Sequence, residues 1–189
     1  MIFSGEFVKA ILENRKTQTR RVIWQQPIDI LPMKANDKWI TLQTVNPNHG
    51  RVIKCRFGIP RDRIWVRETF CDLGGGSMPG RVLYKATFDD LTAEMMRQSG
   101  HGMPIWKPSI HMPRWASRIT LEVVNVVVER VQDISEEGAI YEGMEPKEPN
   151  HVVSAKYRFA KFWDSINLKR GFGWDSNCWV WVIEFKRIG

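Results

Sequence analysis

The sequence predicts an α+β fold: a mixed β-barrel flanked by helices, with loop insertions. Many short segments alternate apolar and polar residues, which is typical of strands with one buried face. Helical patterns lie between these segments without the regular strand–helix–strand order of a doubly wound sheet, which favours a small mixed barrel. With 189 residues, of which 43% are hydrophobic, the chain can bury a full core, and we expect residues 1–189 to form a single domain.

A short helix is predicted at residues 4–14. Ser4 can serve as its N-cap, and Asn14 should end it, because Asn tolerates the left-handed conformation found at many helix C-termini. The chain then becomes basic and rich in hydroxyl groups over residues 15–21, where a core-forming segment would alternate apolar residues. This segment is either a solvated cationic loop or a site projected from the end of the helix. Residues 22–24, Val-Ile-Trp, should lead the chain into the body of the protein.

Two insertions interrupt the predicted barrel. The first covers about residues 25–50 and contains three prolines, so we expect an extended or hairpin-bearing excursion. The second covers about residues 71–113 and includes a glycine-rich loop without the Lys and Ser/Thr of a phosphate-binding P-loop. The predicted elements are, in order, strands at 51–55, 64–70 and 82–86, a helix at 87–98, strands at 118–123 and 126–131, helices at 135–143 and 154–166, and a strand at 178–185.

Composition limits the partners that we expect. The net charge of +7 favours a polyanionic partner such as RNA or DNA. Cys55, Cys71 and Cys178 lie far apart without C-x-x-C spacing, which argues for reduced thiols rather than disulfides or a zinc site, so no metal or cofactor is predicted. No apolar run approaches the roughly 20 residues that span a bilayer, and the N-terminus lacks a signal-peptide pattern. We therefore expect a cytoplasmic protein without a membrane partner.

One carboxylate lies where helix electrostatics disfavour it. Glu142 falls in the last turn of a predicted helix, directly before Gly143, where the negative end of the helix dipole costs a carboxylate roughly 0.3–1 kcal/mol. It is either a solvated glutamate tied to a nearby lysine or a carboxylate held against the basic segment. In the second case its partner would be a cation from the segment around Lys16.

Four stretches of the chain together resemble the ASCH domain of the PUA-like superfamily. They are Lys16-Thr17-Gln18-Thr19-Arg20-Arg21 after the first helix, Pro60-Arg61-Asp62-Arg63-Ile64-Trp65-Val66, the run from Asp133-Ile134-Ser135 to Glu142-Gly143, and Trp179-Val180-Trp181-Val182-Ile183-Glu184-Phe185. The resemblance spans nearly the whole chain and is greatest to uncharacterised proteins of bacteriophages and prophages, which implies the cytoplasm of a host cell. The sequence departs from the family pattern at Asn14 and Arg61, where glycine is common.

The resemblance implies a β-barrel beside a cleft that suits RNA or a nucleoside. In the ASCH-type amidohydrolases that remove acetyl from N4-acetylcytidine, a Lys, a Thr and a Glu form the working group, and by motif these are Lys16, Thr19 and Glu142. Thr19 would attack, or position a water, if a neutral Lys16 takes the proton; burial and the neighbouring arginines would lower the pKa of Lys16. Because ideal strand geometry would turn Lys16 and Thr19 to opposite sides, this mechanism needs an irregularity between them. If the barrel brings the helix that begins at Ser135 against the end of the first helix, we expect Glu142 within salt-bridge distance of Lys16, with Thr19 opening to the same cleft.

Other residues are candidates for binding or for the cleft. Glu68 and Tyr84 could point into the cleft, although they equally fit a buried ion pair and a core tyrosine, and His111 could serve as a general base. Cationic and aromatic residues suit phosphate contacts and base stacking, and those assigned to nucleic-acid binding are Arg15, Arg20, Arg21, Trp65, Arg114, Trp115 and Arg118.

Three alternatives to the amidohydrolase remain open. The chain could bind RNA or a modified base without catalysis, cleave RNA as a ribonuclease, or act as a viral protein that binds a host protein. The sequence does not predict the oligomeric state.

Overall fold

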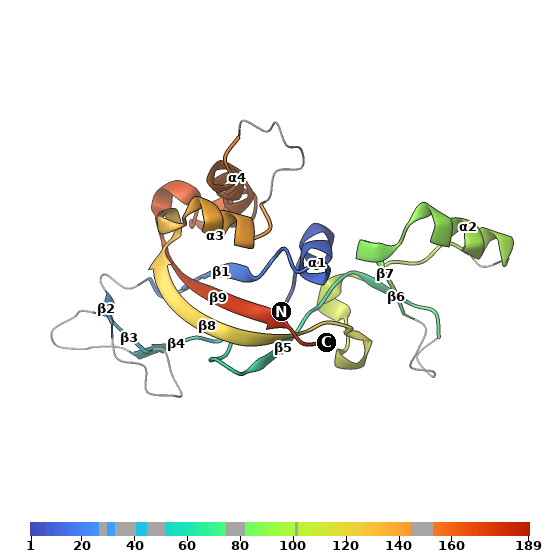
Figure 1. Ribbon diagram of the computed structural model, residues 1–189, viewed down its shortest axis with the longest axis horizontal. Helices are drawn as coiled ribbons and strands as arrows, with labels where there is room; N and C mark the ends of the chain where they lie inside the picture. The colour runs from blue at the N-terminus through green and yellow to red at the C-terminus, as the bar shows by residue number, and fades with distance from the viewer. Residues whose placement is uncertain (27–29, 33–40, 45–51, 75–81, 101, 145–152) are drawn as a thin grey trace. The chain divides into compact units, whose positions relative to one another are not determined.

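The largest sheet has four strands in the order β1-β9-β8-β5 and forms a curled, antiparallel half-barrel (Figure 1). The computed structural model describes residues 1–26, 30–32, 41–44, 52–74, 82–100, 102–144 and 153–189. The four strands are β1 (Gln18–Val22), β9 (Trp179–Arg187), β8 (Thr120–Arg130) and β5 (Arg63–Trp65). The mixed α+β class is confirmed, together with a barrel-like sheet.

The chain divides into two compact units. The first comprises Met1–Asn14, Ile64–Leu121 and Arg187–Gly189, and the second comprises Arg15–Arg63 and Glu122–Lys186. No helix in the described part of the chain is long and apolar enough to cross a membrane. The three cysteines are buried and free, and burial raises the pKa of Cys55 to about 11.

In the first unit, helix α1 (Gly5–Leu12) buries Val8, Ala10 and Ile11 and ends as predicted, since Asn14 is left-handed with φ of 58°. Ser4 occupies the N-cap position, but its side chain makes no capping hydrogen bond. The other elements of this unit are β6 (Phe70–Asp72), β7 (Val82–Tyr84), the 3₁₀ turns η1 (Lys85–Thr87), η2 (Ser109–His111) and η3 (Arg114–Ala116), and helix α2 (Asp90–Gln98).

Two boundaries predicted for this unit were wrong. The strand expected at 64–70 is split into β5 and β6, because the backbone N–H of Val66 donates to Ile119 whereas that of Phe70 donates to Lys107. The helix expected from residue 87 begins at Asp90, because the Asp89 side chain accepts from the Thr92 N–H and so fixes the N-terminus.

The expected break in β8 was also wrong. Strands at 118–123 and 126–131 were predicted, but the structure has one continuous strand. Its buried residues include Leu121, Val123 and then Val126, so the alternation shifts by one residue at exposed positions 124 and 125. Such a shift, which a β-bulge produces, makes one strand resemble two in the sequence.

The second unit places two helices over β1. Helix α3 (Glu136–Tyr141) packs against β1 and against helix α4 (Ala155–Asn167), on the same side of the sheet (Figure 1). Ser135 and Ser154 are the N-caps of these helices, and each side chain accepts a backbone N–H from three residues later. The 3₁₀ turn η4 (Val131–Asp133) leads into α3, η5 (Leu168–Arg170) follows α4, and η6 (Trp174–Ser176) precedes β9.

Helical spacing in the sequence of α4 predicts one apolar stripe of Phe159, Phe162, Trp163 and Ile166, and the structure differs from this in part. Phe159 and Trp163 are buried, but Ile166 is 44% exposed. Asn167 is buried in its place, where its amide donates to the carbonyl of Trp163. The helix therefore ends its buried face on a hydrogen-bonded amide rather than on the predicted isoleucine.

The described part of the first insertion is a small antiparallel sheet, which fits the predicted hairpin. Strand β3 (Thr41–Thr44) pairs with β2 (Ile30–Pro32) on one side and with β4 (Val52–Lys54) on the other. The rest of that insertion, and the glycine-rich loop beyond Gly74, lie outside the described residues.

Candidate functional site

Backbone contacts fix the segment that carries Lys16. Thr17 donates its N–H to the carbonyl of Tyr141 in α3 and accepts at its own carbonyl from Phe185 of β9. From Gln18 onward β1 pairs antiparallel with β9, with Gln18 opposite Glu184. The segment is therefore held between the C-terminal end of α3 and the edge of the sheet.

Lys16 and Glu142 form a buried ion pair, as predicted. The Lys16 ammonium donates to Glu142 Oε2 at 2.6 Å and to the Glu142 backbone carbonyl at 2.7 Å, and each residue is 2% exposed. Glu142 is the C-cap of α3, and Gly143 follows with φ of 90°. One ammonium thus compensates both the carboxylate and a helix-terminal carbonyl, which explains why a carboxylate is tolerated at this helix end.

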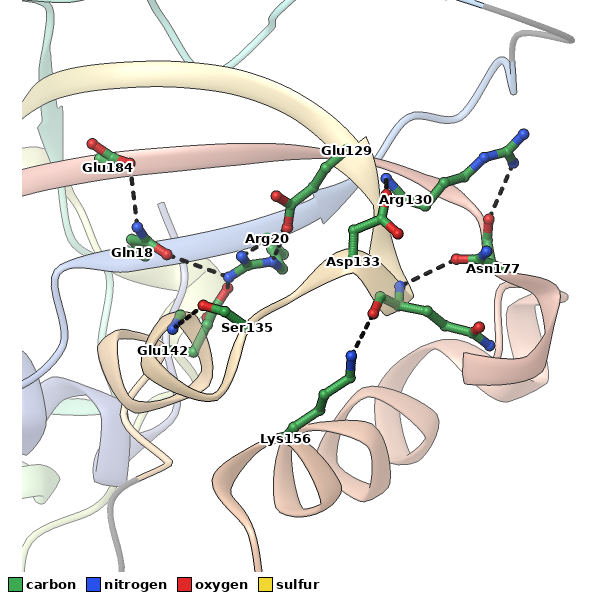
Figure 2. A network of polar contacts seen from close by, with 12 residues as sticks. Gln18, Arg20, Glu129, Arg130, Asp133, Ser135, Glu142, Lys156, Asn177 and Glu184 are labelled. Carbon is green, nitrogen blue, oxygen red and sulfur yellow. Dashed lines mark hydrogen bonds and ion pairs between the residues drawn. The ribbon is translucent and has the colours of Figure 1, made fainter.

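Arg20 extends the ion pair into a network, and Figure 2 shows Arg20 with Glu129 and Glu142. Its guanidinium binds Glu129 of β8, with Nε and Nη2 2.8 and 2.7 Å from Oε1, and it reaches Glu142 Oε1 with Nη1 at 3.3 Å. It also lies over the Phe159 ring, 5.8 Å from the centroid. Because a Cβ at Gly138 would lie 3.2 Å from Arg20 Nη2, the glycine permits this close approach of α3. Two cations and two carboxylates therefore meet beneath α3.

The pKa of Lys16 is lowered from 10.5 to about 8. Burial is the largest cause; the charge of Glu142 and its hydrogen bond act in the opposite direction, and Arg21 and Arg20 lower the pKa further. Near neutral pH a minor but appreciable fraction of Lys16 is therefore neutral. This is the environment that the amidohydrolase hypothesis requires of a base.

Thr19 lies near this cluster in sequence, but none of the contacts above involves it. It is buried in β1, opposite Ile183. Strand alternation puts Thr19 on the face opposite Arg20, but because β1 begins at Gln18, alternation does not fix the side of Lys16. The structure thus brings Lys16, Glu142 and Arg20 together, and a cleft shared by Thr19 and Lys16 stays a prediction.

Arg21 and Arg15, the other arginines assigned to nucleic-acid binding in this segment, are both half-buried. Burial lowers the pKa of Arg21 most, Glu142 raises it, and the positive charge of Arg170 lowers it. The basic segment is therefore partly interior, and the hypothesis of a solvated cationic loop does not describe it.

The first unit holds a second buried carboxylate, and its contacts favour the structural alternative. Arg118 binds Glu68 through two parallel hydrogen bonds of 2.9 Å, donates to the Thr87 hydroxyl, and lies 3.9 Å from the Tyr84 ring centroid. The Tyr84 hydroxyl donates to the carbonyl of Ala116, and burial raises its pKa. Arg118 thus forms an ion pair with Glu68, whereas the sequence predicted a phosphate contact for it.

The remaining candidates of the first unit lie nearer the surface. Arg67 and Arg114 lie 4.4 and 5.9 Å from the ring centroid of Trp65. Trp115 is 51% exposed, and His111 is exposed in η2. Trp65 therefore already interacts with cations of its own chain, while Trp115 offers its ring to solvent.

A pocket of about 110 Å³ in the second unit was not predicted from the sequence. Arg20 and Arg21 line it together with Trp24, Trp163 and Arg170. Trp24 was expected to enter the body of the protein but is 56% exposed, with the Arg170 guanidinium 4.5 Å from its ring centroid. The excess of cations was visible in the sequence, but their convergence with Trp24 depends on how α4 packs on β1.

Comparisons with known proteins give no match: no family model, curated protein or solved structure is similar to this chain. Among the described residues there is also no group of three or more His, Cys, Asp or Glu side chains that could hold a metal ion.

Proposed function

We propose that this protein is an ASCH-like member of the PUA-like superfamily that acts on RNA or a modified nucleoside, with Lys16 and Glu142 at its chemical centre. The proposed reaction is hydrolysis of the N4-acyl group of an acylated cytidine. The observation that carries the proposal is the buried Lys16–Glu142 pair with its lowered lysine pKa, at the two positions that the family motif assigns to catalysis.

Backbone geometry adds support for the family assignment. Asn14 and Arg61 are the two positions at which this sequence departs from a common glycine of the family. Both have positive φ, of 58° and 78°. Glycine adopts this conformation without strain, whereas other residues adopt it rarely. The departures therefore preserve the backbone conformation that a glycine would favour.

The chemistry follows from the lowered pKa of Lys16. Neutral Lys16 takes a proton from water, or from the Thr19 hydroxyl, as the nucleophile adds to the acyl carbonyl. The cytidine N4 leaves with a proton, and the products are cytidine and the carboxylate. If Thr19 is the nucleophile, water then hydrolyses the acyl ester. Glu142 orients Lys16 and stabilises its protonated form, and the cation cluster favours the developing oxyanion.

Turnover of N4-acetylcytidine to cytidine and acetate, followed by chromatography without added metal, tests the proposal. Lys16→Arg keeps the positive charge but cannot act as a base, so we expect turnover to fall at least a hundredfold. Lys186→Arg is the matched control, because Lys186 is an exposed lysine of the same unit that pairs with Glu122. For the wild type, kcat/KM should rise with pH to a plateau above about pH 8.

Absence of product from acylated cytidines would reject the amidohydrolase. Cleavage of structured RNA that Lys16→Arg abolishes would identify a ribonuclease instead.

A non-catalytic binding module is the second candidate, and one observation favours it. Lys16 is almost entirely buried, and two of its hydrogen bonds go to Glu142, as in a structural ion pair. In that case Lys16→Arg would leave affinity for RNA within a few-fold of the wild type, with no turnover in either protein. Binding would weaken steeply with salt, because each neutralised phosphate releases about one counterion.

A further inference from the structure

The pocket in the second unit gathers cations, and no acidic residue is among its described lining. Arg20, on one wall, already pairs with Glu129 and Glu142. Arg170, by contrast, donates to the side-chain carbonyl of Asn167 at 3.1 Å and lies over Trp24, both neutral groups. Arg21 interacts favourably with the charge of Glu142 and unfavourably with that of Arg170. An anion between these guanidinium groups would relieve that repulsion.

The volume of the pocket and the residues that line it limit the kind of ligand that it can bind. Pockets for drug-sized molecules measure roughly 300–1,000 Å³, so about 110 Å³ admits a small group and not a whole nucleotide. Phe57 and Trp163 supply aromatic walls. Trp24 is 56% exposed and so offers ring surface outside the enclosed volume, on which a base can stack.

We infer that this pocket binds a phosphate group of a nucleotide, held by Arg21 and Arg170, with the base stacked on Trp24. Guanidinium groups bind phosphate oxygens through paired, charge-assisted hydrogen bonds. The choice of a nucleotide rests on the proposed function, whereas the choice of a phosphate rests on the charge and size of the pocket. The phosphate belongs either to a mononucleotide or to an RNA backbone.

Calorimetric titration of the wild-type chain tests this inference. Cytidine 5′-monophosphate should bind at least tenfold more tightly than cytidine, and inorganic phosphate should compete with it. A short oligocytidylate that binds much more tightly than the monophosphate identifies RNA as the phosphate source; equal affinities identify a mononucleotide. Equal affinities of cytidine and its monophosphate, or no binding of either, would overturn the inference.

Substitutions of the pocket residues test whether the phosphate and the base bind at this pocket. Arg170→Gln should weaken monophosphate binding about tenfold or more, and Arg170→Lys should weaken it less, because it keeps the charge and loses the planar fork. Lys169→Gln is the matched control, since it removes the same charge from the adjacent exposed residue outside the pocket lining. Trp24→Leu should weaken binding of the monophosphate without affecting that of inorganic phosphate. An equal loss in Lys169→Gln and Arg170→Gln would overturn the inference in favour of general surface charge.

Failure of this inference is distinguishable from failure of the proposed function. Phosphate-dependent binding that Arg170→Gln removes, without turnover of any acylated cytidine, supports the pocket and rejects the amidohydrolase. The opposite result supports the amidohydrolase and rejects the phosphate pocket. In that result, free N4-acetylcytidine and its 5′-monophosphate are turned over at equal kcat/KM, and binding does not depend on the phosphate.

Discussion

Two buried carboxylates, Glu142 in the second unit and Glu68 in the first, are both paired with cations. They differ in the number of charged groups that share the pairing. Glu68 meets one arginine through two parallel hydrogen bonds, and that arginine is covered by the Tyr84 ring. Glu142 is shared between Lys16 and Arg20, and Arg20 also binds Glu129. The first arrangement is a closed fork, and the second is an extended network.

The difference shows which of the two arrangements can support chemistry. The partner of Glu68 is a guanidinium held by two parallel hydrogen bonds. The partner of Glu142 is the ammonium of Lys16, whose pKa burial lowers to about 8 and which can therefore give up a proton near neutral pH. Burial of a charged pair is common to both sites, so the proposed function rests on the lowered pKa of Lys16 and not on burial alone.

The largest expected difference is in stability. Glu142→Ala should lower the free energy of unfolding by about 3–5 kcal/mol, because it leaves Lys16 without its carboxylate in the interior. Glu68→Ala should cost less, about 1–3 kcal/mol, because the Arg118 side chain is 26% exposed and water can hydrate it. Urea unfolding monitored by tryptophan fluorescence measures both. A greater loss in Glu68→Ala would show that the network at Glu142 is the less important of the two for the fold.

The next expected effect is a rise in stability with pH that the Lys16 network should produce. Below about pH 8 Lys16 is protonated in both the folded and the unfolded chain, and folding bears the cost of burying its charge. Between about pH 8 and 10.5 the folded chain releases the proton while the unfolded chain keeps it, so the free energy of unfolding rises with pH. Relative to Lys16→Met, the wild type should gain up to roughly 3 kcal/mol over this interval.

Unfolding of both proteins at pH 7.5, 9 and 10 gives the difference directly, and titrations common to the two cancel. A difference that stays flat or falls as pH rises would contradict the lowered pKa of Lys16.

How much of the site the sequence could predict depended on whether a local rule was involved. The helix around Ser135 and the need of Glu142 for a cationic partner could be predicted, because a serine cap and a carboxylate at the wrong helix end are local features. The choice of Lys16 as that partner came from the family resemblance and not from a local rule. Glu129 could not be found, because its contact with Arg20 requires the strand order and the phase of β8. That phase shifts within the strand, which also caused the false break near Asn125.

The pocket shows the same limit at longer range. Trp24 follows a buried Val-Ile pair, so its apolar neighbours predicted burial. The structure instead pairs it with Arg170, more than a hundred residues further along the chain. Similarly, periodicity placed Ile166 on the buried face of α4, where Asn167 lies instead. These outcomes depend on how the end of α4 packs, which a single sequence does not encode locally.

The smallest expected effect concerns the closed fork itself. Arg118→Lys keeps the charge opposite Glu68 but replaces two parallel hydrogen bonds and a planar group over Tyr84 with a single ammonium. We expect a loss of about 1 kcal/mol in the free energy of unfolding, because the ion pair survives while one hydrogen bond and the cation–π contact weaken. Arg97→Lys is the matched control: Arg97 pairs with Glu94 on the surface of α2, where the same exchange removes no buried contact and stability should stay unchanged. If the two variants lose the same free energy of unfolding in urea, the two parallel hydrogen bonds of Arg118 contribute no stability beyond its charge. The closed fork at Glu68 would then not differ in this respect from an ordinary ion pair.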